Sequence, residues 1–433
     1  MPAERAILVT IQLDPRFAEG RSRWRLEDEE QELKELATSS GCRIVGEVSA
    51  RRHRPIAGTL LGQGKLEEIA ERVAEWQAQV VIFSQELSSA QQRNIEDLLL
   101  VKTIDRTQLI LDIFAQRARS QEGKVQVELA QLRYLLPRLV GKGIMLSRLG
   151  GGIGTRGPGE QKLEVDRRRI RARISRLGDE LERLGRRREA TRSRRKESTV
   201  PVAALVGYTN AGKTTLLNRL TGAGGTVQNQ LFTTLDPLAR RMRLPAATGA
   251  AQAGGFQGYT LIVTDTVGFL HHLPHHLIEA FKATLEEARD ADVLLHVLDV
   301  SHPLASAHAE AVEEVLQQLA LQHKPVITVL NKCDCLEDPS RLAALTHAFA
   351  PAAAISAKTG QGIEQLTALI EERLSLSLSE PVHLRVPLAR ADILATIYQS
   401  GHVLARTEAD GALTIRARLP DRLQAALAQY LLS

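Results

Sequence analysis

The sequence predicts an α/β fold made of several domains, and three observations predict it. The chain has 433 residues, which is too long for one ordinary hydrophobic core. Short apolar runs alternate with amphipathic stretches through most of the chain, as in strand–helix–strand units. A long, basic stretch of helical periodicity separates two such regions. We therefore expect four parts, at residues 1–106, 107–198, 199–376 and 381–433.

Composition excludes several classes of protein. Hydrophobic residues make up 43% and charged residues 25% of the chain, a balance typical of globular proteins. The sequence contains no run of 18 apolar residues, so we expect no integral membrane segment. The N-terminus has no cleavable signal pattern. The three cysteines are too few for a disulfide framework. We expect a cytoplasmic protein that acts as a monomer.

The first part reads as a small parallel α/β domain. Residues 6–11, 43–48 and 80–84 are β-like runs, and residues 26–37 and 66–76 carry apolar side chains at helical spacing. This alternation predicts a parallel sheet covered by helices. The part contains no recognisable catalytic constellation.

The second part reads as a long antiparallel helical hairpin. Residues 108–139 predict one helix and residues 161–196 a second. In the second helix, apolar residues recur at steps of three, four and seven positions. This spacing predicts an apolar seam that packs along the first helix. The seam consists of Leu163, Ile170, Ile174, Leu177, Leu181 and Leu184. Residues 141–159 join the two helices, and this glycine-rich segment is much longer than a hairpin turn needs.

Charge is concentrated on the second helix of this arm. The whole chain carries a formal charge of +5, but residues 167–196 contain fourteen Lys or Arg against four Asp or Glu. Such segregation is typical of either a solvated charged helix or an element that binds a polyanion. Glycines in the tip also permit close approach of the backbone to another surface. We expect contacts with RNA from Lys142, Arg148, Arg156, Arg167, Arg168, Arg171 and Arg173.

The third part begins with a phosphate-binding loop. An apolar strand at residues 202–206 runs into the pattern G-x-x-x-x-G-K-[ST], and a helical pattern follows. In this context backbone N–H groups turn inward on phosphates at a helix N-terminus. Lys213 is expected to reach the β- and γ-phosphates, and the Thr214 hydroxyl to ligate Mg²⁺. The nucleotide contacts expected here come from Gly207, Tyr208, Thr209, Asn210, Ala211, Gly212, Lys213, Thr214 and Thr215.

Two motifs that sense a γ-phosphate follow in order. The first lies in a polar stretch where a switch loop belongs, and its Thr234 is the expected second ligand of the metal; it consists of Phe232, Thr233, Thr234, Leu235 and Asp236. The second follows an apolar strand and consists of Asp265, Thr266, Val267 and Gly268. Asp265 is expected to hold the metal through water, and the Gly268 N–H to contact the γ-phosphate.

Two further motifs match a guanine base. One closes the strand at residues 326–330 and consists of Asn331, Lys332, Cys333 and Asp334. The Asp334 carboxylate matches the two adjacent N–H donors of guanine. The other motif, Ser356, Ala357 and Lys358, is expected to contact the guanine oxygen through its backbone. Five motifs in order predict a P-loop GTPase domain that binds GTP and GDP, with catalytic residues Lys213, Thr234, Asp265 and Gly268.

One position departs from the simplest GTPase pattern. Phe269 stands where a glutamine often orients the attacking water, and its side chain cannot hydrogen-bond water. We therefore expect slow intrinsic hydrolysis that a partner stimulates. Asn210 occupies the loop position that helps to hold K⁺ in potassium-stimulated GTPases, although an ordinary loop asparagine explains it equally well.

Segments outside these five motifs resemble the HflX family of ribosome-associated GTPases. The resemblance rests on residues 151–160 (GGIGTRGPGE) with the Arg-rich helix after them, and on residues 88–94, 105–107 and 122–132. It covers nearly the whole chain and weakens after about Leu374. The second switch of that family also carries Phe after the motif glycine, so Phe269 fits its pattern.

The resemblance implies a cytoplasmic GTPase that binds the large ribosomal subunit and acts in translation, in ribosome rescue or splitting under stress, or in ribosome biogenesis. It also implies that the N-terminal and helical domains make the main ribosome contacts, and that the glycine-rich tip approaches the peptidyl-transferase region. An RNA-processing or RNA-modifying GTPase remains an alternative, as does a switch whose arm binds another protein. The small α/β part at residues 381–433 has no assigned role.

Overall fold

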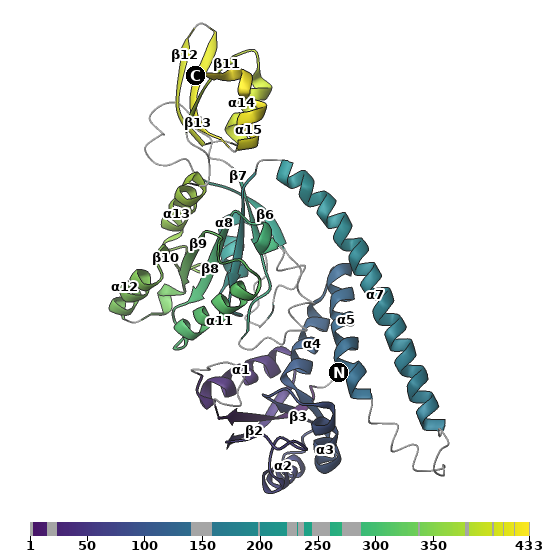
Figure 1. Cartoon of the computed structure of the whole chain (residues 1–433). Helices are drawn as coiled ribbons and strands as arrows, with labels where there is room; N and C mark the ends of the chain where they lie inside the picture. The colour runs from purple at the N-terminus through teal and green to yellow at the C-terminus, as the bar shows by residue number, and fades with distance from the viewer. Residues whose placement is uncertain are drawn as a thin grey trace. The chain divides into compact units, whose positions relative to one another are not determined.

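In a computed structural model of the chain (Figure 1), two compact units are distinguished. The first contains residues 1–185, 230–235 and 272–281, and the second contains the remainder. The described residues are 3–14, 24–139, 158–197, 200–222, 232, 238–244, 260–270, 287–336, 338–376, 381–400, 402–409, 411–419 and 421–432.

The first unit begins with a four-stranded parallel sheet in the order β2-β1-β3-β4. Its strands are β1 (Arg5–Leu13), β2 (Arg43–Arg52), β3 (Val80–Phe83) and β4 (Lys102–Asp105). Helices connect consecutive strands: α1 (Leu26–Ser39), α2 (Gln63–Glu75) and α3 (Ser89–Leu99). β3 is buried at all four residues, as expected for a strand with helices over both faces. The predicted parallel sheet is present, and β4 and α3 extend it.

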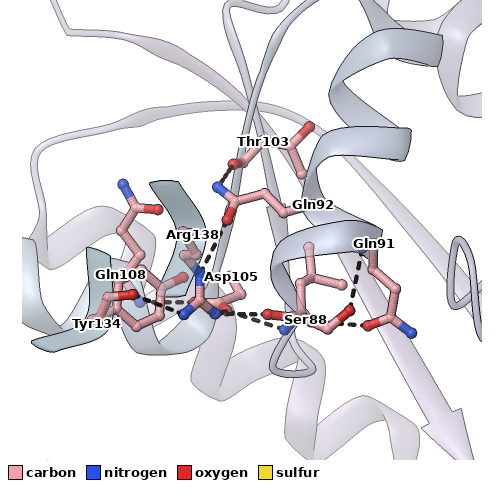
Figure 2. Close-up of polar contacts among 9 residues, drawn as sticks. Ser88, Gln91, Gln92, Thr103, Asp105, Gln108, Tyr134 and Arg138 are labelled. Atoms are coloured by element: carbon pink, nitrogen blue, oxygen red, sulfur yellow. Dashed lines mark hydrogen bonds and ion pairs between the residues drawn. The ribbon is translucent and has the colours of Figure 1, made fainter. Parts of the chain in front are cut away.

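A buried polar network ties this sheet to the helices that follow it (Figure 2). Asp105 is fully buried; its Oδ1 accepts from the Gln108 backbone N–H at 2.8 Å, which caps α4 (Arg106–Arg117). Its Oδ2 accepts from the Leu87 N–H at 3.0 Å and from Arg138 Nη2 at 3.2 Å. Arg138, at the end of α5 (Gln121–Arg138), also donates to Oε1 of Gln92 at 3.2 Å. Two segments that carry the family resemblance, residues 88–94 and 105–107, meet in this network.

The expectation of one helix from residue 108 to residue 139 is wrong. The chain forms α4 and α5 instead, with a break at residues 118–120. The Ser120 hydroxyl accepts from the Gly123 N–H at 2.9 Å, so it caps a new helix rather than continuing the first. Apolar spacing alone could not reveal the break because it continues across residues 118–120.

The second helix of the arm is α7 (Pro158–Glu197), of 40 residues. Part of the predicted seam lies against α5: Leu177 is fully buried with Val125 and Leu129, and Ile174 and Leu181 pack beside them. Arg173 donates to both carboxylate oxygens of Glu128, at 2.7 and 2.9 Å. The two helices therefore pair through apolar side chains and one bidentate ion pair.

The second unit contains a six-stranded sheet in the order β10-β9-β8-β5-β7-β6. β6 (Leu238–Arg243) runs antiparallel to β7, and every other neighbouring pair is parallel. The parallel strands are β5 (Val202–Gly207), β7 (Thr260–Asp265), β8 (Val293–Asp299), β9 (Val326–Asn331) and β10 (Ala352–Ala354). Helices flank the sheet: α8 (Lys213–Thr221), α11 (Ala305–Gln318), α12 (Pro339–Ala348) and α13 (Ile363–Leu376).

The chain ends in a separate four-stranded antiparallel sheet with the order β12-β13-β11-β14. Its elements are β11 (Val382–Pro387), α14 (Ala391–Ser400), β12 (His402–Ala409), β13 (Ala412–Arg418), α15 (Asp421–Ala426) and β14 (Leu431–Leu432). The α/β class and the mainly parallel GTPase-type sheet are confirmed. Among the described helices, none is long and apolar enough to cross a membrane.

Candidate nucleotide-binding site

The phosphate-loop residues join the carboxyl end of β5 to the first turn of α8. The loop curls around the side chain of Lys213, which is only 7% exposed. Its Nζ donates to the carbonyls of Gly207 at 3.0 Å and Tyr208 at 2.7 Å. Burial lowers the pKa of Lys213 to about 8, against a smaller opposite effect of the Asp265 carboxylate. A charged group held inside a loop of backbone amides suits a phosphate ligand.

Asn331 fixes the loop from the neighbouring side of the sheet. Its Nδ2 donates to the Ala211 carbonyl at 2.8 Å, and its Oδ1 accepts from the Ala357 N–H at 3.0 Å. Gly212 lies at φ +95°, and a Cβ there would collide with Asn331 Nδ2. This asparagine therefore joins the phosphate loop to the segment at residues 356–358, and the closeness of the contact requires glycine at position 212.

Thr214 and Asp265 meet beside the loop. The Thr214 hydroxyl donates to Oδ2 of Asp265 at 2.8 Å, and Asp265 is fully buried at the end of β7. The next residue, Thr266, is also buried and donates its hydroxyl to the Leu205 carbonyl at 2.7 Å. Strand pairing between β5 and β7 thus places a hydroxyl and a carboxylate together, a donor set that suits a hard cation.

The segment after Asp265 lies directly against the phosphate loop. The Thr209 N–H donates to the Phe269 carbonyl at 2.8 Å, and the Phe269 N–H donates to the Gly207 carbonyl at 3.1 Å. The Phe269 side chain is only 1% exposed. A Cβ on Gly268 would lie 2.8 Å from Thr209 Cγ2 and 3.0 Å from Lys213 Nζ, so only glycine fits there.

The candidate base-binding residues lie at the ends of β9 and β10. Asp334 is exposed, and hydrogen bonding from the Ser356 side chain lowers its pKa below the usual value for aspartate. Asp334 is therefore an ionised acceptor at neutral pH. The Arg219 guanidinium from α8 donates to the carbonyls of Ala357 and Lys358, which holds that segment in place.

Several contacts at this site were not anticipated from the sequence. The Lys332 ammonium lies 2.6 Å from Oδ2 of Asp299, at the end of β8. The Tyr208 ring stacks on His308 of α11, with centroids 3.9 Å apart and planes 6° apart. Burial, and then the nearby His302, lower the pKa of His308 to about 3, so a neutral imidazole supports the loop. Asp299 could have been found because it ends an apolar strand at the same sheet edge, whereas His308 carried no sequence signal.

The expected switch residues are only partly described. Thr233, Thr234, Leu235 and Asp236 lie outside the described residues. Phe232 is buried and belongs to the first unit, where its ring lies edge-on to Phe114 with centroids 4.5 Å apart. The expected RNA-contacting residues divide in the same way. Lys142, Arg148 and Arg156 lie outside the described residues, whereas the side chains of Arg168 and Arg171 are exposed on α7, Arg167 is half-buried, and Arg173 pairs with Glu128.

Family comparisons match most of the chain between residues 27 and 431. Four families match in succession: "GTP-binding GTPase N-terminal" at residues 27–115, "GTP-binding GTPase Middle Region" at residues 117–195, "50S ribosome-binding GTPase" at residues 202–332, and "HflX C-terminal domain" at residues 342–431. The last match includes the C-terminal part, where the sequence resemblance was weakest.

Individual proteins agree with these matches. The chain is 45% identical to GTPase HflX of Caldanaerobacter subterraneus over 99% of this chain and 94% of that protein. It is 44% identical to GTPase HflX of Escherichia coli over 90% and 89% of the two chains. Among solved structures, a GTP-binding protein from Sulfolobus solfataricus in complex with GDP is 24% identical, with a TM-score of 0.44 over 86% of this chain and 99% of that one. On the sequence matches, the chain belongs to the HflX family of GTPases.

Proposed function

We propose that the chain hydrolyses GTP with the aid of Mg²⁺ while it is bound to the large ribosomal subunit. One observation supports the proposed hydrolysis of GTP. The Thr214 hydroxyl lies 2.8 Å from Oδ2 of Asp265, and Lys213, the residue before Thr214, is buried. In this proposal Lys213 neutralises the β- and γ-phosphates, and the Gly268 N–H donates to the γ-phosphate. Thr214 and Thr234 would supply the protein ligands of the metal, and Asp265 would hold it through water.

The residues fit a magnesium ion because they present oxygen atoms from a hydroxyl and a carboxylate, the ligands that Mg²⁺ prefers. When bound, the ion neutralises charge on the phosphate oxygens. The chain's own groups bind and orient the nucleotide. Phe269 contributes no water-orienting group, so the free protein should be a slow enzyme.

The large ribosomal subunit is the proposed partner because α7, a helix of 40 residues, presents exposed arginines, including Arg168 and Arg171. Guanidinium groups bind phosphates bidentately, so such a helix suits an RNA surface. The description of the family that matches residues 202–332, "50S ribosome-binding GTPase", supports the same partner. Ribosome splitting, rescue and assembly are later steps that this binding would serve.

Co-sedimentation tests this proposal. The full-length protein is pelleted with purified large subunits in the presence of GDP, GTP or a non-hydrolysable GTP analogue, with free tRNA as the competing RNA. We expect binding that depends on the nucleotide and at least a tenfold rise in GTP turnover upon addition of subunits. Equal turnover with and without subunits, or equal affinity for tRNA, would contradict the proposal.

A further inference from the structure

Tyr208, the second residue of the phosphate loop, is held at both its backbone and its ring. Its carbonyl accepts from Lys213 Nζ at 2.7 Å, and its backbone pairs with that of Phe269 in a parallel bridge. Tyr208 is only 5% exposed, so its ring lies in the protein interior. A buried side chain occupies one rotamer, so a contact that fixes the ring also limits where the carbonyl of the same residue can lie.

The ring of Tyr208 packs face to face with an imidazole from α11. The centroids of Tyr208 and His308 are 3.9 Å apart, and their planes are inclined by 6°. His308 is buried in a helix that lies against β5 and β8. Its neighbours in α11 that are also buried are Ala305, Ala309 and Val312. Such close parallel packing requires two flat rings, and an aliphatic side chain at position 308 would not reproduce it.

Helix α11 is itself fixed where it begins. His302 precedes the helix, and its Nδ1 accepts from the Leu304 N–H at 3.1 Å. The carbonyl of His302 accepts from Arg341 of α12 at 3.1 Å, and its ring lies 4.5 Å from that of His308. Burial, and then His302, lower the pKa of His308 to about 3. The ring that packs on Tyr208 is therefore uncharged at neutral pH and is held by its helix.

We propose that His308 is a positioning residue of the phosphate loop. Its ring fixes the ring of Tyr208, and the Tyr208 carbonyl then holds the Lys213 ammonium where phosphate binds. This inference rests on the function proposed above, because it requires that Lys213 binds the phosphates of GTP. Core packing is the alternative role. In that case His308 would stabilise α11 and would leave nucleotide affinity unchanged.

His308→Phe and His308→Leu separate the two roles. Phenylalanine keeps a flat ring beside Tyr208, whereas leucine is apolar without one. Dissociation constants for fluorescent GTP and GDP analogues, and thermal unfolding, are measured for the full-length parent and each variant. Val312→Ala is the matched control, because Val312 is buried one turn further along the same helix and its truncation leaves the Tyr208–His308 pair intact.

We expect His308→Phe to bind GTP and GDP within about twofold of the parent, and His308→Leu to bind both about threefold to tenfold more weakly, which is the range for an aromatic pair. The preference of the Leu variant for GTP over xanthosine triphosphate should stay unchanged, because base recognition is proposed to belong to Asp334. Val312→Ala should lower the unfolding temperature and bind GTP as the parent does. In a chain that also carries Tyr208→Ala, the Phe and Leu variants should bind GTP equally, since His308 acts through the Tyr208 ring.

Equal GTP affinities of the Phe and Leu variants would overturn the proposal, and so would a difference between them that persists in the Tyr208→Ala chain. A loss of affinity in Val312→Ala as large as in His308→Leu would also overturn it, because any weakening of α11 would then suffice. Lys213→Met separates this inference from the proposed function. If Lys213→Met bound GTP as tightly as the parent, the phosphate contact in that function would fail. Weak binding by Lys213→Met together with parent affinity in His308→Leu would refute the role of His308 alone.

Discussion

The Thr214 hydroxyl donates a hydrogen bond to Oδ2 of Asp265 at 2.8 Å and thereby joins the first turn of α8 to the end of β7. Both residues come from motifs that lie 51 residues apart in the chain. Parallel pairing of β5 with β7 brings them together, since Leu205 lies opposite Asp265. The contact therefore depends on the sheet and not on local sequence.

Thr214→Ala should abolish GTP hydrolysis, because it removes an oxygen proposed to bind Mg²⁺ and leaves Asp265 without that donor. Turnover should fall by at least about a hundredfold, which corresponds to roughly 3 kcal/mol in the activation free energy. Thr214→Ser keeps the hydroxyl and should retain most activity. Turnover is measured as phosphate release at saturating Mg²⁺. Full activity in a folded alanine variant would contradict the role of Thr214.

GTP affinity should fall as pH rises above 8, because burial lowers the pKa of Lys213 to about 8 in the nucleotide-free protein. Phosphates favour the ammonium form, so the free protein must take up a proton on binding when the pH exceeds this pKa. Affinity should be flat below pH 8 and should fall by up to about tenfold per pH unit above it. Fluorescent GTP titrations from pH 6.5 to pH 9 measure the trend.

Lys213→Met is the control for this pH dependence. The Met variant should bind GTP weakly at every pH. Its GTP affinity should no longer show the fall above pH 8 that deprotonation of Lys213 causes. Two other titratable groups lie near the lysine: the Asp265 carboxylate, and His296, whose pKa burial and the lysine charge lower to about 4. His296 therefore does not titrate in this range. The same slope in the Met variant would assign the pH dependence to another group.

The sequence could predict which residues gather at the candidate nucleotide-binding site because their motifs are short, local and placed at strand ends. The glycines of the loop, Thr214, and Asp334 each carry their chemistry in residue type and spacing. The contacts that hold them in place could not be predicted in the same way. Asn331 bridges to Ala211 over 120 positions in the chain, and only the folded sheet sets that distance.

The helical arm shows a similar division. The spacing of Ile174, Leu177 and Leu181 predicted the packing against a partner helix, and these residues do pack against α5. The break between α4 and α5 was missed because apolar spacing continues across it, while the Ser120 cap that marks the start of α5 is a local polar contact. Arg173 was grouped with the RNA contacts, but its bidentate pairing with Glu128 gives it a structural role as well.

Potassium should accelerate hydrolysis if Asn210 helps to hold a monovalent cation. Asn210 is exposed in the phosphate loop in the left-handed conformation, with φ +60°. GTP turnover is compared in K⁺ and in Na⁺ at equal ionic strength. We expect faster turnover in K⁺, and Asn210→Ala should remove the difference. Equal rates in the two salts would show that Asn210 is an ordinary loop residue.

Charge reversal on α7 should weaken binding to the large subunit. Arg168→Glu with Arg171→Glu changes two exposed arginines and leaves the Arg173–Glu128 pair intact. The salt dependence of binding should fall by about two phosphate contacts, and nucleotide affinity should stay unchanged. Arg289→Glu, at an exposed position shortly before β8, is the matched control. Equal affinities of the double variant and this control would remove α7 from the ribosome-binding surface.

Base identity should depend on Asp334. Guanine presents N1–H and the 2-amino group side by side, and one carboxylate accepts from both. Hydrogen bonds to charged groups contribute roughly 1.5–3 kcal/mol each, so the pair supplies about 3–6 kcal/mol of discrimination against ATP. At about 1.4 kcal/mol per tenfold, this predicts a preference from about a hundredfold to several thousandfold. Asp334 is ionised at neutral pH, and the hydrogen bond from the Ser356 side chain lowers the pKa of its carboxyl further.

Asp334→Asn replaces one acceptor oxygen by a donor, which suits xanthine because its position 2 is a carbonyl. The variant should bind GTP at least about a hundredfold more weakly, since it loses roughly 3 kcal/mol or more. It should also gain affinity for xanthosine triphosphate, because the phosphate loop is unchanged. Asp338→Asn is the matched control, since Asp338 is exposed nearby and its side chain caps α12 through the Ser340 N–H at 2.9 Å. Affinities are measured by titration with fluorescent analogues of GTP, ATP and xanthosine triphosphate at fixed Mg²⁺. If the Asp334→Asn protein bound GTP as tightly as the Asp338→Asn control, Asp334 would not recognise the base.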